Sequence, residues 1–193
     1  MIKLGLTGNI GSGKTTVSKV FESLGIPIFY ADNEAKKLYS LDHVKERVLL
    51  LFGKSIINDL EEVDFRLLSD LVFNDKNKLK ELTSIIHPLV FNNYHKWLET
   101  IQQEPYSIHE SAIIYEYSQQ KYFDKVICVT APYELRVQRI LERDNTSRDK
   151  VEERIRNQMT ETEKISLSDF VIVNDEKSFI IKQVLKIHYN LKK

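Results

Sequence analysis

The stretch of sequence that decides the fold is Gly8-Asn9-Ile10-Gly11-Ser12-Gly13-Lys14-Thr15. It follows a short apolar run, Ile2–Leu6, and precedes apolar residues at helical spacing such as Val17 and Phe21. Glycines let the chain curl so that successive backbone N–H groups point inward at an anion. A helix that starts where the curl ends adds its positive N-terminal end. The pattern therefore predicts a phosphate-binding loop between a strand and a helix.

Two side chains of this loop have the chemistry to act on a nucleotide. Lys14 would reach the β- and γ-phosphates, and the Thr15 hydroxyl would ligate Mg²⁺. ATP and Mg²⁺ are therefore the expected co-substrate and metal ion. The alternative is a glycine-rich turn that binds nothing. The residues expected to hold the nucleotide phosphates are Gly11, Ser12, Gly13, Lys14, Thr15 and Thr16.

Composition restricts the class of protein. The chain has 193 residues, 42% of them hydrophobic, and 28 basic side chains balance 28 acidic ones. This length suits one domain with an insertion, and balanced charge argues against sequence-independent nucleic-acid binding. The lone Cys128 cannot form an internal disulfide, which favours a reducing compartment. With no signal-peptide pattern or membrane-span length of apolar residues, we expect a soluble cytoplasmic protein without nucleic-acid or membrane partners, either a monomer or a small homo-oligomer.

Strand-like and helical patterns alternate along most of the chain. The strand-like runs are Ile2–Leu6, Ile26–Tyr30, Tyr106–His109, Lys125–Val129 and Phe170–Val173. This alternation is typical of an α/β protein with a parallel sheet. We therefore predict a three-layer α/β P-loop NTPase fold with a central parallel sheet.

One interval is too long for a simple crossover between strands, and its pattern is almost entirely helical. Its apolar residues recur at spacings of three and four, as one buried helix face requires. They are Val44, Val48, Leu51 and Phe52; Leu67, Leu68, Leu71 and Val72; and Leu79, Leu82, Ile85 and Ile86. We predict that residues 33–104 form a helical insertion that holds a second substrate. Residues 1–32 and 105–193 would then form the nucleotide-binding core.

Asp32 follows the second predicted strand. In an open parallel sheet, ligands gather beyond the carboxyl ends of the strands, so Asp32 and the phosphate-binding loop would share one edge. A carboxylate there can accept or orient the proton of an attacking hydroxyl, as phosphoryl transfer requires. An N-cap for a helix that begins near Asn33 explains the same position equally well.

Arginine is concentrated in one segment of the chain. Six of the eight arginines lie there, and they are Arg136, Arg139, Arg143, Arg148, Arg154 and Arg156. The planar guanidinium group suits phosphate oxygens, whose charge develops during transfer. We predict a mobile lid at about residues 136–165 that closes over ATP. The alternative is a solvated pair of helices with surface ion pairs, which contribute little stability.

Weaker signals come from four further residues. Glu110 and Glu116 follow the third predicted strand and could help place Mg²⁺ or a substrate hydroxyl. Proline tends to end or kink a helix at the preceding residue, so His87, before Pro88, is either a helix-end residue or a ligand contact. Asn174 follows the last predicted strand, where its backbone or amide group could meet the adenine ring. Turn formation explains Asn174 equally well.

Together these motifs resemble the dephospho-coenzyme A kinase family of P-loop kinases over nearly the whole chain. The matching segments are Leu6–Thr16, Ala31-Asp32, Asp70–Phe73 with Asp75, Ile86–Val90, Arg139–Asn145 with Arg148 and Gln158, and Ser168–Asn174. The resemblance implies transfer of the ATP γ-phosphate to the ribose 3′-hydroxyl of dephospho-coenzyme A, the last step of coenzyme A synthesis.

The same resemblance implies roles for particular residues. Asp32 would engage the attacking hydroxyl, and the insertion around Phe73 and His87 would hold the acceptor. Arg139 and Arg143 would serve the lid. Glu110 is expected as a further acceptor contact, with Lys14, Asp32 and the two lid arginines as the catalytic residues.

Two positions depart from the pattern of the family. Tyr30 stands where the family often has an acidic residue, and Ala112–Glu116 replaces a Pro-Leu-Leu-Phe-Glu segment. A kinase of another small acceptor, such as a nucleoside monophosphate, shares the fold and the ATP chemistry. Such kinases favour an arginine soon after the second strand, and only Arg47 and Arg66 precede the arginine segment. A GTP-dependent switch needs Asp-x-x-Gly, which the glycines of this chain do not provide.

Overall fold

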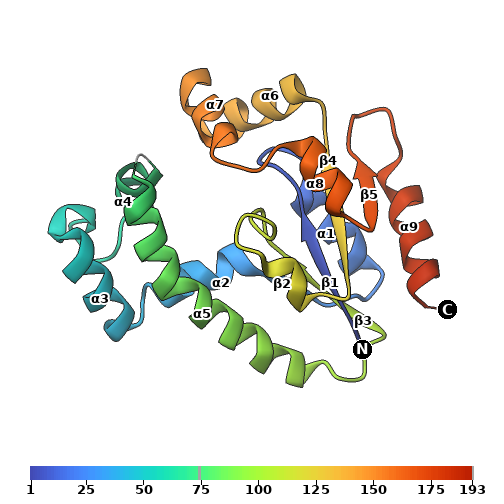
Figure 1. Cartoon of the computed structure of the whole chain (residues 1–193), viewed down its shortest axis with the longest axis horizontal. Coiled ribbons are helices and arrows are strands. Elements are labelled where there is room, and N and C mark those ends of the chain that lie inside the picture. Colours follow the sequence, from blue (N-terminus) through green and yellow to red (C-terminus); the bar gives the residue numbers. More distant parts are fainter. Residues whose placement is uncertain (74, 193) are drawn as a thin grey trace. The chain divides into compact units, whose positions relative to one another are not determined.

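The computed structural model (Figure 1) describes residues 1–73 and 75–192, with the side chains of all of these except Phe73 and Lys76. The chain divides into two compact units, Met1–Tyr30 with Ile101–Lys193, and Ala31–Thr100. Among the described residues, no helix is both long enough and apolar enough to cross a membrane.

A five-stranded sheet forms the centre of the first unit. Its order is β2-β3-β1-β4-β5, and every neighbouring pair is parallel. The strands are β1 (Ile2–Thr7), β2 (Ile28–Tyr30), β3 (Tyr106–Glu110), β4 (Lys125–Thr130) and β5 (Phe170–Val173). All five predicted runs form strands, and the prediction of an α/β fold with a parallel sheet is confirmed.

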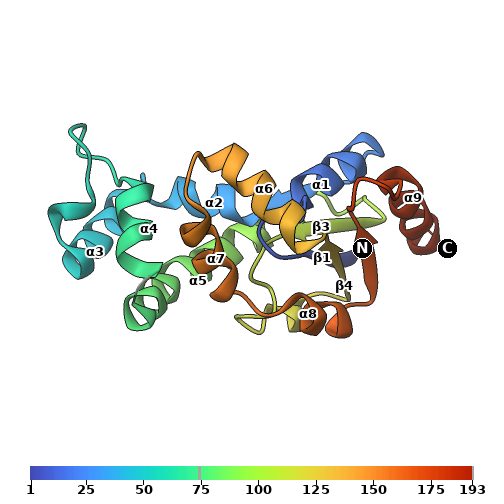
Figure 2. The same ribbon diagram turned by 90° about the horizontal axis from the view of Figure 1, so that it is seen from above.

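Helices cover both faces of this sheet. The helices of this unit are α1 (Lys14–Ser23), α6 (Tyr133–Asp144), α7 (Arg148–Arg156), α8 (Glu161–Leu167) and α9 (Ile180–Leu191), with the short η2 (Gln119–Tyr122). Figure 2 shows α1 and α9 on one side of the sheet and α8 on the other. Alternate strand residues such as Leu4, Leu6 and Ile127 pack with Phe21 of α1 and Val184 of α9, because successive strand side chains point to opposite faces.

The opposite face of the sheet is covered by the segment between β3 and β4. A Cβ atom added to Gly5 would lie 2.9 Å from side-chain atoms of both Ile114 and Phe123. Only glycine therefore allows this segment to approach the central strand so closely. Cys128 is buried in β4, and burial raises its thiol pKa to about 11, so it has the character of an inert core residue.

The second unit is helical, as the spacing of its apolar residues predicts. Its elements are α2 (Ala31–Leu38), α3 (Asp42–Phe52), η1 (Lys54–Ile56), α4 (Phe65–Phe73) and α5 (Lys76–Thr100). Its core includes Val44, Val48, Leu68, Ile85 and Ile86, whereas Leu51 and Leu67 are each 43% exposed. The prediction of burial was wrong for those two leucines, because each lies at the margin of the apolar stripe.

Two predictions about helix ends were also wrong. Helix α5 continues through Pro88, so His87 is not a helix-end residue. An internal proline costs about 3 kcal/mol, and burial of Ile85, Ile86 and Val90 on the adjacent turns offsets that cost. Helix α2 begins at Ala31, which makes Asp32 its second residue rather than its N-cap. A carboxylate in the first turn is still favoured by the helix dipole.

Candidate active site

The phosphate-binding loop lies at the carboxyl edge of the sheet, directly after the central strand β1. A Cβ atom added to Gly8 would lie 2.2 Å from the Val129 carbonyl oxygen of β4. Gly13 is the N-cap of α1 and has φ 91°, a left-handed conformation that favours glycine. These two close constraints set the path of the loop between β1 and α1.

The first turn of α1 has the properties of an anion site. Within the described chain, no side chain caps this helix and no acidic residue lies in its first turn. The N–H groups at the start of a helix have no partners inside the helix, so a turn without a side-chain cap suits an anion. Lys14 folds back over the loop, and its Nζ donates to the Gly8 carbonyl oxygen at 3.1 Å. The side chains of Thr15 and Thr16 are exposed beside it.

The residues present fit a Mg²⁺ ion that arrives with a nucleotide. Thr15 offers one exposed hydroxyl in the first turn of α1, and the described residues contain no cluster of three or more His, Cys, Asp or Glu that could hold a metal alone. Mg²⁺ usually keeps several waters and binds through one or two protein oxygens together with phosphates. The Thr15 hydroxyl therefore fits as one protein ligand of an ion that is otherwise held by phosphate oxygens and waters.

Asn174 and Arg139 support the outer side of the loop. The Asn174 Nδ2 donates to the Ser12 carbonyl oxygen at 2.8 Å, and its backbone N donates to Thr130 at 2.8 Å. The Arg139 guanidinium donates to the carbonyl oxygens of Gly11 at 3.4 Å and Asn174 at 3.3 Å. The structure thus brings these two predicted site residues together with the loop. An adenine contact of Asn174 stays a prediction, since its amide already serves the loop.

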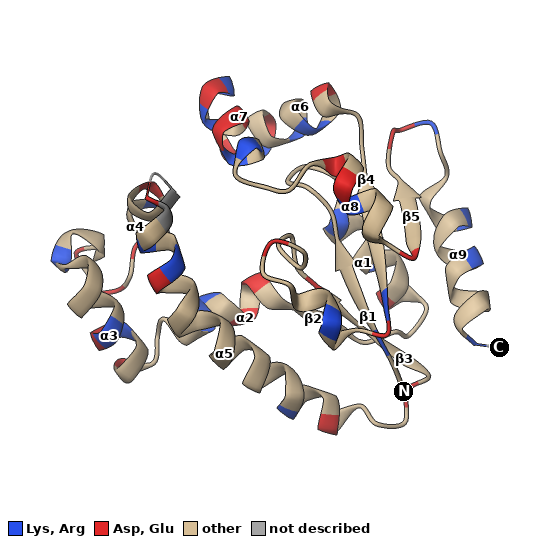
Figure 3. Cartoon of the chain, in the orientation of Figure 1, with Lys and Arg blue, Asp and Glu red and all other residues tan. Residues whose placement is uncertain are grey.

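Three further arginines of the predicted lid take part in ion pairs. Figure 3 shows basic and acidic residues interleaved along α6 and α7. Arg143 pairs with Asp144 at 2.7 Å, Arg154 pairs with the same carboxylate at 2.8 Å, and Arg148 pairs with Glu134 at 2.8 Å. Partly exposed pairs of this kind contribute little stability. Arg143 is 63% exposed in its side chain, so a phosphate could compete for it, and the lid role stays a prediction.

Arg136 differs from the other arginines of this segment. It is 4% exposed, and its Nε donates to the Ala131 carbonyl oxygen at 3.1 Å. Its guanidinium also lies over the ring of Tyr133. These contacts fix the start of α6 after β4, so Arg136 has a structural role. Arg139 and Arg143 are therefore the two arginines of this helix that stay candidates for phosphate binding.

Glu110 and Tyr30 lie at the same carboxyl edge of the sheet. Glu110 ends β3, is 6% exposed, and stands opposite Leu6 on one side and Tyr30 on the other. Burial raises the pKa of Tyr30 to about 12, and a hydrogen bond to Glu22 and the charges of Glu22 and Glu110 act in the same direction. Tyr30 therefore stays protonated at neutral pH and does not supply the negative charge of an acidic residue.

Three of the predicted acceptor residues belong to the helical unit. Asp32 lies in the first turn of α2, and His87 lies in the middle of α5. Burial lowers the pKa of His87, so its imidazole is neutral at neutral pH. Phe73 ends α4, and its side chain lies outside the described residues. Contacts of these three residues with an acceptor stay predictions.

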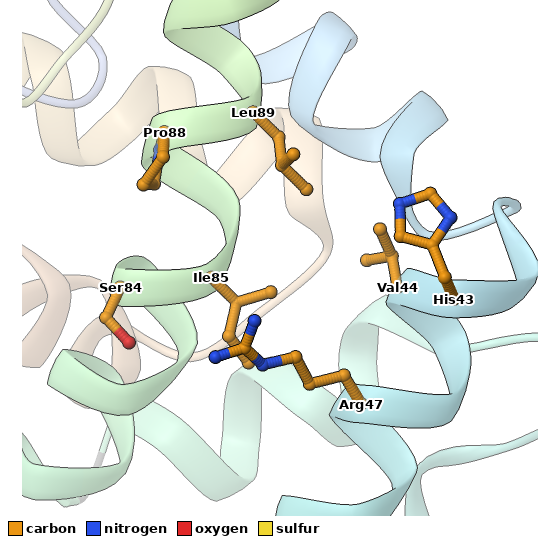
Figure 4. Close-up of a pocket in the computed structure, with 7 residues that line it drawn as sticks. All are labelled: His43, Val44, Arg47, Ser84, Ile85, Pro88 and Leu89. Atoms are coloured by element: carbon orange, nitrogen blue, oxygen red, sulfur yellow. The ribbon is translucent and has the colours of Figure 1, made fainter.

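The helical unit contains a pocket between α3 and α5 (Figure 4). Its volume is about 200 Å³, and its lining residues are His43, Val44, Arg47, Ser84, Ile85, Pro88 and Leu89. Figure 4 shows the Arg47 side chain reaching from α3 toward Ile85 of α5. Apolar walls with one guanidinium group suit a ligand that joins an apolar part to a negative charge.

One cluster of buried and half-buried polar side chains could not be predicted from the sequence. Lys164 is buried in α8 and lies 2.7 Å from Glu116, and Gln158 contacts the phosphate-binding loop through Ile10. Gln158 was matched by resemblance alone, and Glu116 was a weak candidate for metal or substrate binding. No periodicity distinguishes Lys164 from the other lysines, so no sequence signal could have indicated its burial.

The fold and the site together define a P-loop kinase. A parallel sheet carries an anion-binding loop after its central strand, a lysine lies over that loop, and an arginine-rich helical segment follows β4. This combination is the apparatus of phosphoryl transfer from a nucleoside triphosphate.

Comparison with known proteins identifies the family. The family model for dephospho-CoA kinase matches residues 2–179. A dephospho-CoA kinase of Bacteroides fragilis is 36% identical over 97% of this chain and 96% of its own length. One of Aquifex aeolicus is 35% identical over 99% of this chain and 98% of its own length. A crystal structure from Thermus thermophilus is 31% identical, covers 98% of this chain and 96% of its own, and superposes with a TM-score of 0.87.

The chain therefore belongs to the dephospho-CoA kinase family, which are ATP-dependent transferases of coenzyme A biosynthesis.

The geometry of the loop predicts the effect of a methyl group at Gly13. In Gly13→Ala the added Cβ would lie 2.0 Å from Asn174 Nδ2, in a backbone conformation with φ 91°. The loop must shift, and we expect the Kd for ATP to rise about tenfold or more, which corresponds to about 1.4 kcal/mol. Isothermal titration calorimetry with MgATP measures this change.

Gly25→Ala is the matched control for Gly13→Ala. Gly25 also has positive φ, 80°, but nothing lies within 4 Å of an added Cβ. This variant should lose about 1–2 kcal/mol of stability through backbone strain and keep its ATP affinity. Equal ATP affinity of the two variants would contradict the packing described for the loop.

Proposed function

We propose that this member of the dephospho-CoA kinase family transfers the γ-phosphoryl group of ATP in line to the ribose 3′-hydroxyl of dephospho-CoA, giving coenzyme A and ADP. The observation that carries the proposal is the uncapped first turn of α1 beneath Lys14, which suits the phosphates of ATP. Catalysis would come from positioning and charge stabilisation, without a covalent intermediate.

On the nucleotide side, backbone N–H groups of Gly11 and Gly13–Thr16 would hold the β-phosphate, whereas that of Ser12 would first have to leave the Asn9 carbonyl oxygen, to which it donates at 3.1 Å. Lys14 would exchange its contact with the Gly8 carbonyl oxygen, 3.1 Å long, for contacts with the β- and γ-phosphates. Thr15 would hold Mg²⁺, which when bound supplies positive charge to the phosphate oxygens. Asn174 would line the nucleotide site from the end of β5, where its bond to Ser12 fixes the loop.

On the acceptor side, Asp32 would accept or orient the proton of the 3′-hydroxyl. This carboxylate lies in the first turn of α2, two residues after β2 ends, and a carboxylate is a suitable acceptor for that proton. Glu110, which ends the adjacent strand β3, would be a second polar contact. Arg139 and Arg143 would neutralise charge on the transferring group when the lid closes.

The helical unit would bind the remainder of the acceptor. Phe73 and the neutral His87 would contact it. The pocket between α3 and α5 has apolar walls at Val44, Ile85 and Leu89 and a guanidinium at Arg47. Dephospho-CoA joins a pantetheine arm, which has methyl and methylene groups beside its two amides, to a diphosphate, and a pocket with apolar walls, a hydroxyl at Ser84 and one guanidinium group suits that combination.

An acceptor panel tests the proposed substrate. Dephospho-CoA, adenosine, AMP and shikimate are compared by coupled ADP release at saturating MgATP. We expect kcat/KM for dephospho-CoA to exceed that for each other acceptor by about 10³-fold or more, because binding of the remote arm positions the reacting hydroxyl. A preference for AMP or shikimate would overturn the assignment of the acceptor.

The role of Asp32 predicts a change in kcat. Asp32→Asn keeps the shape of the side chain but cannot take a proton, so kcat should fall about 10²–10³-fold while the KM for ATP stays within about twofold. Steady-state kinetics in both substrates measures the two constants. Asp42→Asn, another first-turn aspartate of the same unit, is the control. Near-normal kcat in Asp32→Asn would remove this carboxylate from the chemistry.

The pocket predicts a change in acceptor affinity. Arg47→Met keeps the apolar stem but removes the charge, so the KM for dephospho-CoA should rise about fivefold, with the KM for ATP unchanged. Arg66→Met, an exposed arginine of the same unit outside the pocket, should leave both constants unchanged. If Arg47→Met and Arg66→Met behave alike, the pocket does not bind the acceptor.

A further inference from the structure

Lys164 is a buried cation that joins two segments of the first unit. Its side chain in α8 is 0% exposed, and its Nζ lies 2.7 Å from Glu116 Oε1. The same Nζ donates to the Ala112 carbonyl oxygen at 2.7 Å. Burying an ammonium group is costly unless it is paired and hydrogen-bonded, so these contacts hold α8 firmly against the turn that follows β3.

A continuous series of contacts leads from this ion pair to the phosphate-binding loop. Glu116 Oε1, the oxygen that pairs with Lys164, also accepts from the backbone N–H of Met159 at 3.0 Å. The Met159 carbonyl oxygen accepts from Asn9 Nδ2 at 2.9 Å. The neighbouring Gln158 Oε1 accepts from the backbone N–H of Ile10 at 2.8 Å. Two adjacent residues of the loop are thus held by a dipeptide that Glu116 holds in turn.

The dipeptide Gln158-Met159 connects the arginine-rich helices to the rest of the first unit. Gln158 and Met159 lie between α7 and α8, where the arginine-rich helices rejoin the rest of the first unit. Helix α8 begins immediately afterwards with a capping box between Thr160 and Glu163. The capping box fixes the direction in which the chain enters α8. Because Lys164 holds α8 against Glu116, the position of Gln158 and Met159 just before the helix is fixed as well.

Helix α8 also contacts the other end of the arginine-rich segment. Glu161 Oε1 accepts from the backbone N–H of Ala131 at 3.3 Å and lies 3.9 Å from Arg136 Nε. Ala131 immediately follows β4, and Arg136 lies in the first turns of α6. The first two turns of α8 therefore hold both ends of the segment that contains α6 and α7.

We propose that Lys164 and Glu116 are positioning residues that hold Gln158 and Met159 against Asn9 and Ile10 and thereby keep the phosphate-binding loop in its ATP-binding shape. The pair acts through the loop and touches neither substrate. This inference rests on ATP binding by the loop, and it adds to the proposed function a device that couples the base of the arginine-rich segment to the nucleotide site.

A double-mutant cycle on ATP affinity tests this proposal in the full chain. Lys164→Met keeps the length of the side chain but removes its charge and donors, and Gln158→Ala removes the acceptor for Ile10. In calorimetric titration with MgATP, the Kd for ATP should rise about tenfold in Lys164→Met and about fivefold in Gln158→Ala. Because both changes release the same contact, the double variant should bind about tenfold more weakly than the wild type, rather than about fiftyfold.

A different ion pair, which is exposed to solvent, provides the control. Lys125 pairs with Asp169 at 3.5 Å in the same unit, with side chains 45% and 40% exposed. Lys125→Met should leave the Kd for ATP unchanged. In steady-state kinetics, Lys164→Met should raise the KM for ATP and leave the KM for the acceptor within about twofold, a split that general loss of stability does not produce.

If Lys164→Met does not fold, the variant Glu116→Gln tests the same ion pair. The amide still accepts from Met159 but no longer neutralises Lys164, and the Kd for ATP should rise about threefold. Unchanged ATP affinity in either folded variant, or effects of Lys164→Met and Gln158→Ala that multiply, would overturn the proposal. Calorimetry with ATP alone does not depend on the acceptor, so failure of this inference is distinguishable from failure of the proposed substrate.

Discussion

The structure depends on a group of backbone N–H donors that have no partner inside their own helix. Parallel strands bring their carboxyl ends to one edge, and the central strand β1 delivers the chain there immediately before α1 begins. Gly13 lets the helix start without a side-chain cap. An anion is therefore a suitable partner for this turn, and the functional residues of the first unit are arranged around it.

Much of the first unit serves to hold this loop in one shape before a ligand arrives. Gly8 packs against the Val129 carbonyl oxygen, Asn174 bonds to Ser12, and Gln158 bonds to Ile10. These contacts come from β4, from the end of β5 and from the segment before α8. Dipoles that are fixed in advance need no reorganisation during the reaction. Electrostatic stabilisation of this kind, together with positioning, accounts for most of the catalysis of phosphoryl transfer.

The sequence was most informative where local pattern and chemistry act within a few residues. The phosphate-binding loop and all five strands could be predicted, because glycine spacing and short apolar runs decide them locally. The continuation of α5 through Pro88 could not be predicted, since packing of Ile85, Ile86 and Val90 overrides the local preference of proline. Leu51 and Leu67 lie at the margins of their apolar stripes, and periodicity alone does not show how much of a stripe is covered.

The candidate site shows the same division. Lys14 and Thr15 follow from the motif, whereas the contacts of Arg139 with Gly11 and Asn174 join residues far apart in the chain. The burial of Lys164 depends on Glu116 and Ala112, both about fifty residues earlier, and neither residue type indicates a partner. Side-chain chemistry can thus be assigned from sequence, but the supporting contacts come only from the fold.

The most direct test of the central claim is a crystal structure of the chain with Mg²⁺, a non-hydrolysable ATP analogue and dephospho-CoA. The account predicts β-phosphate oxygens within about 3.2 Å of the backbone N atoms in the first turn of α1. It also predicts that the acceptor 3′-hydroxyl contacts Asp32. Phosphates bound away from that turn, or an acceptor hydroxyl that contacts no carboxylate, would contradict it.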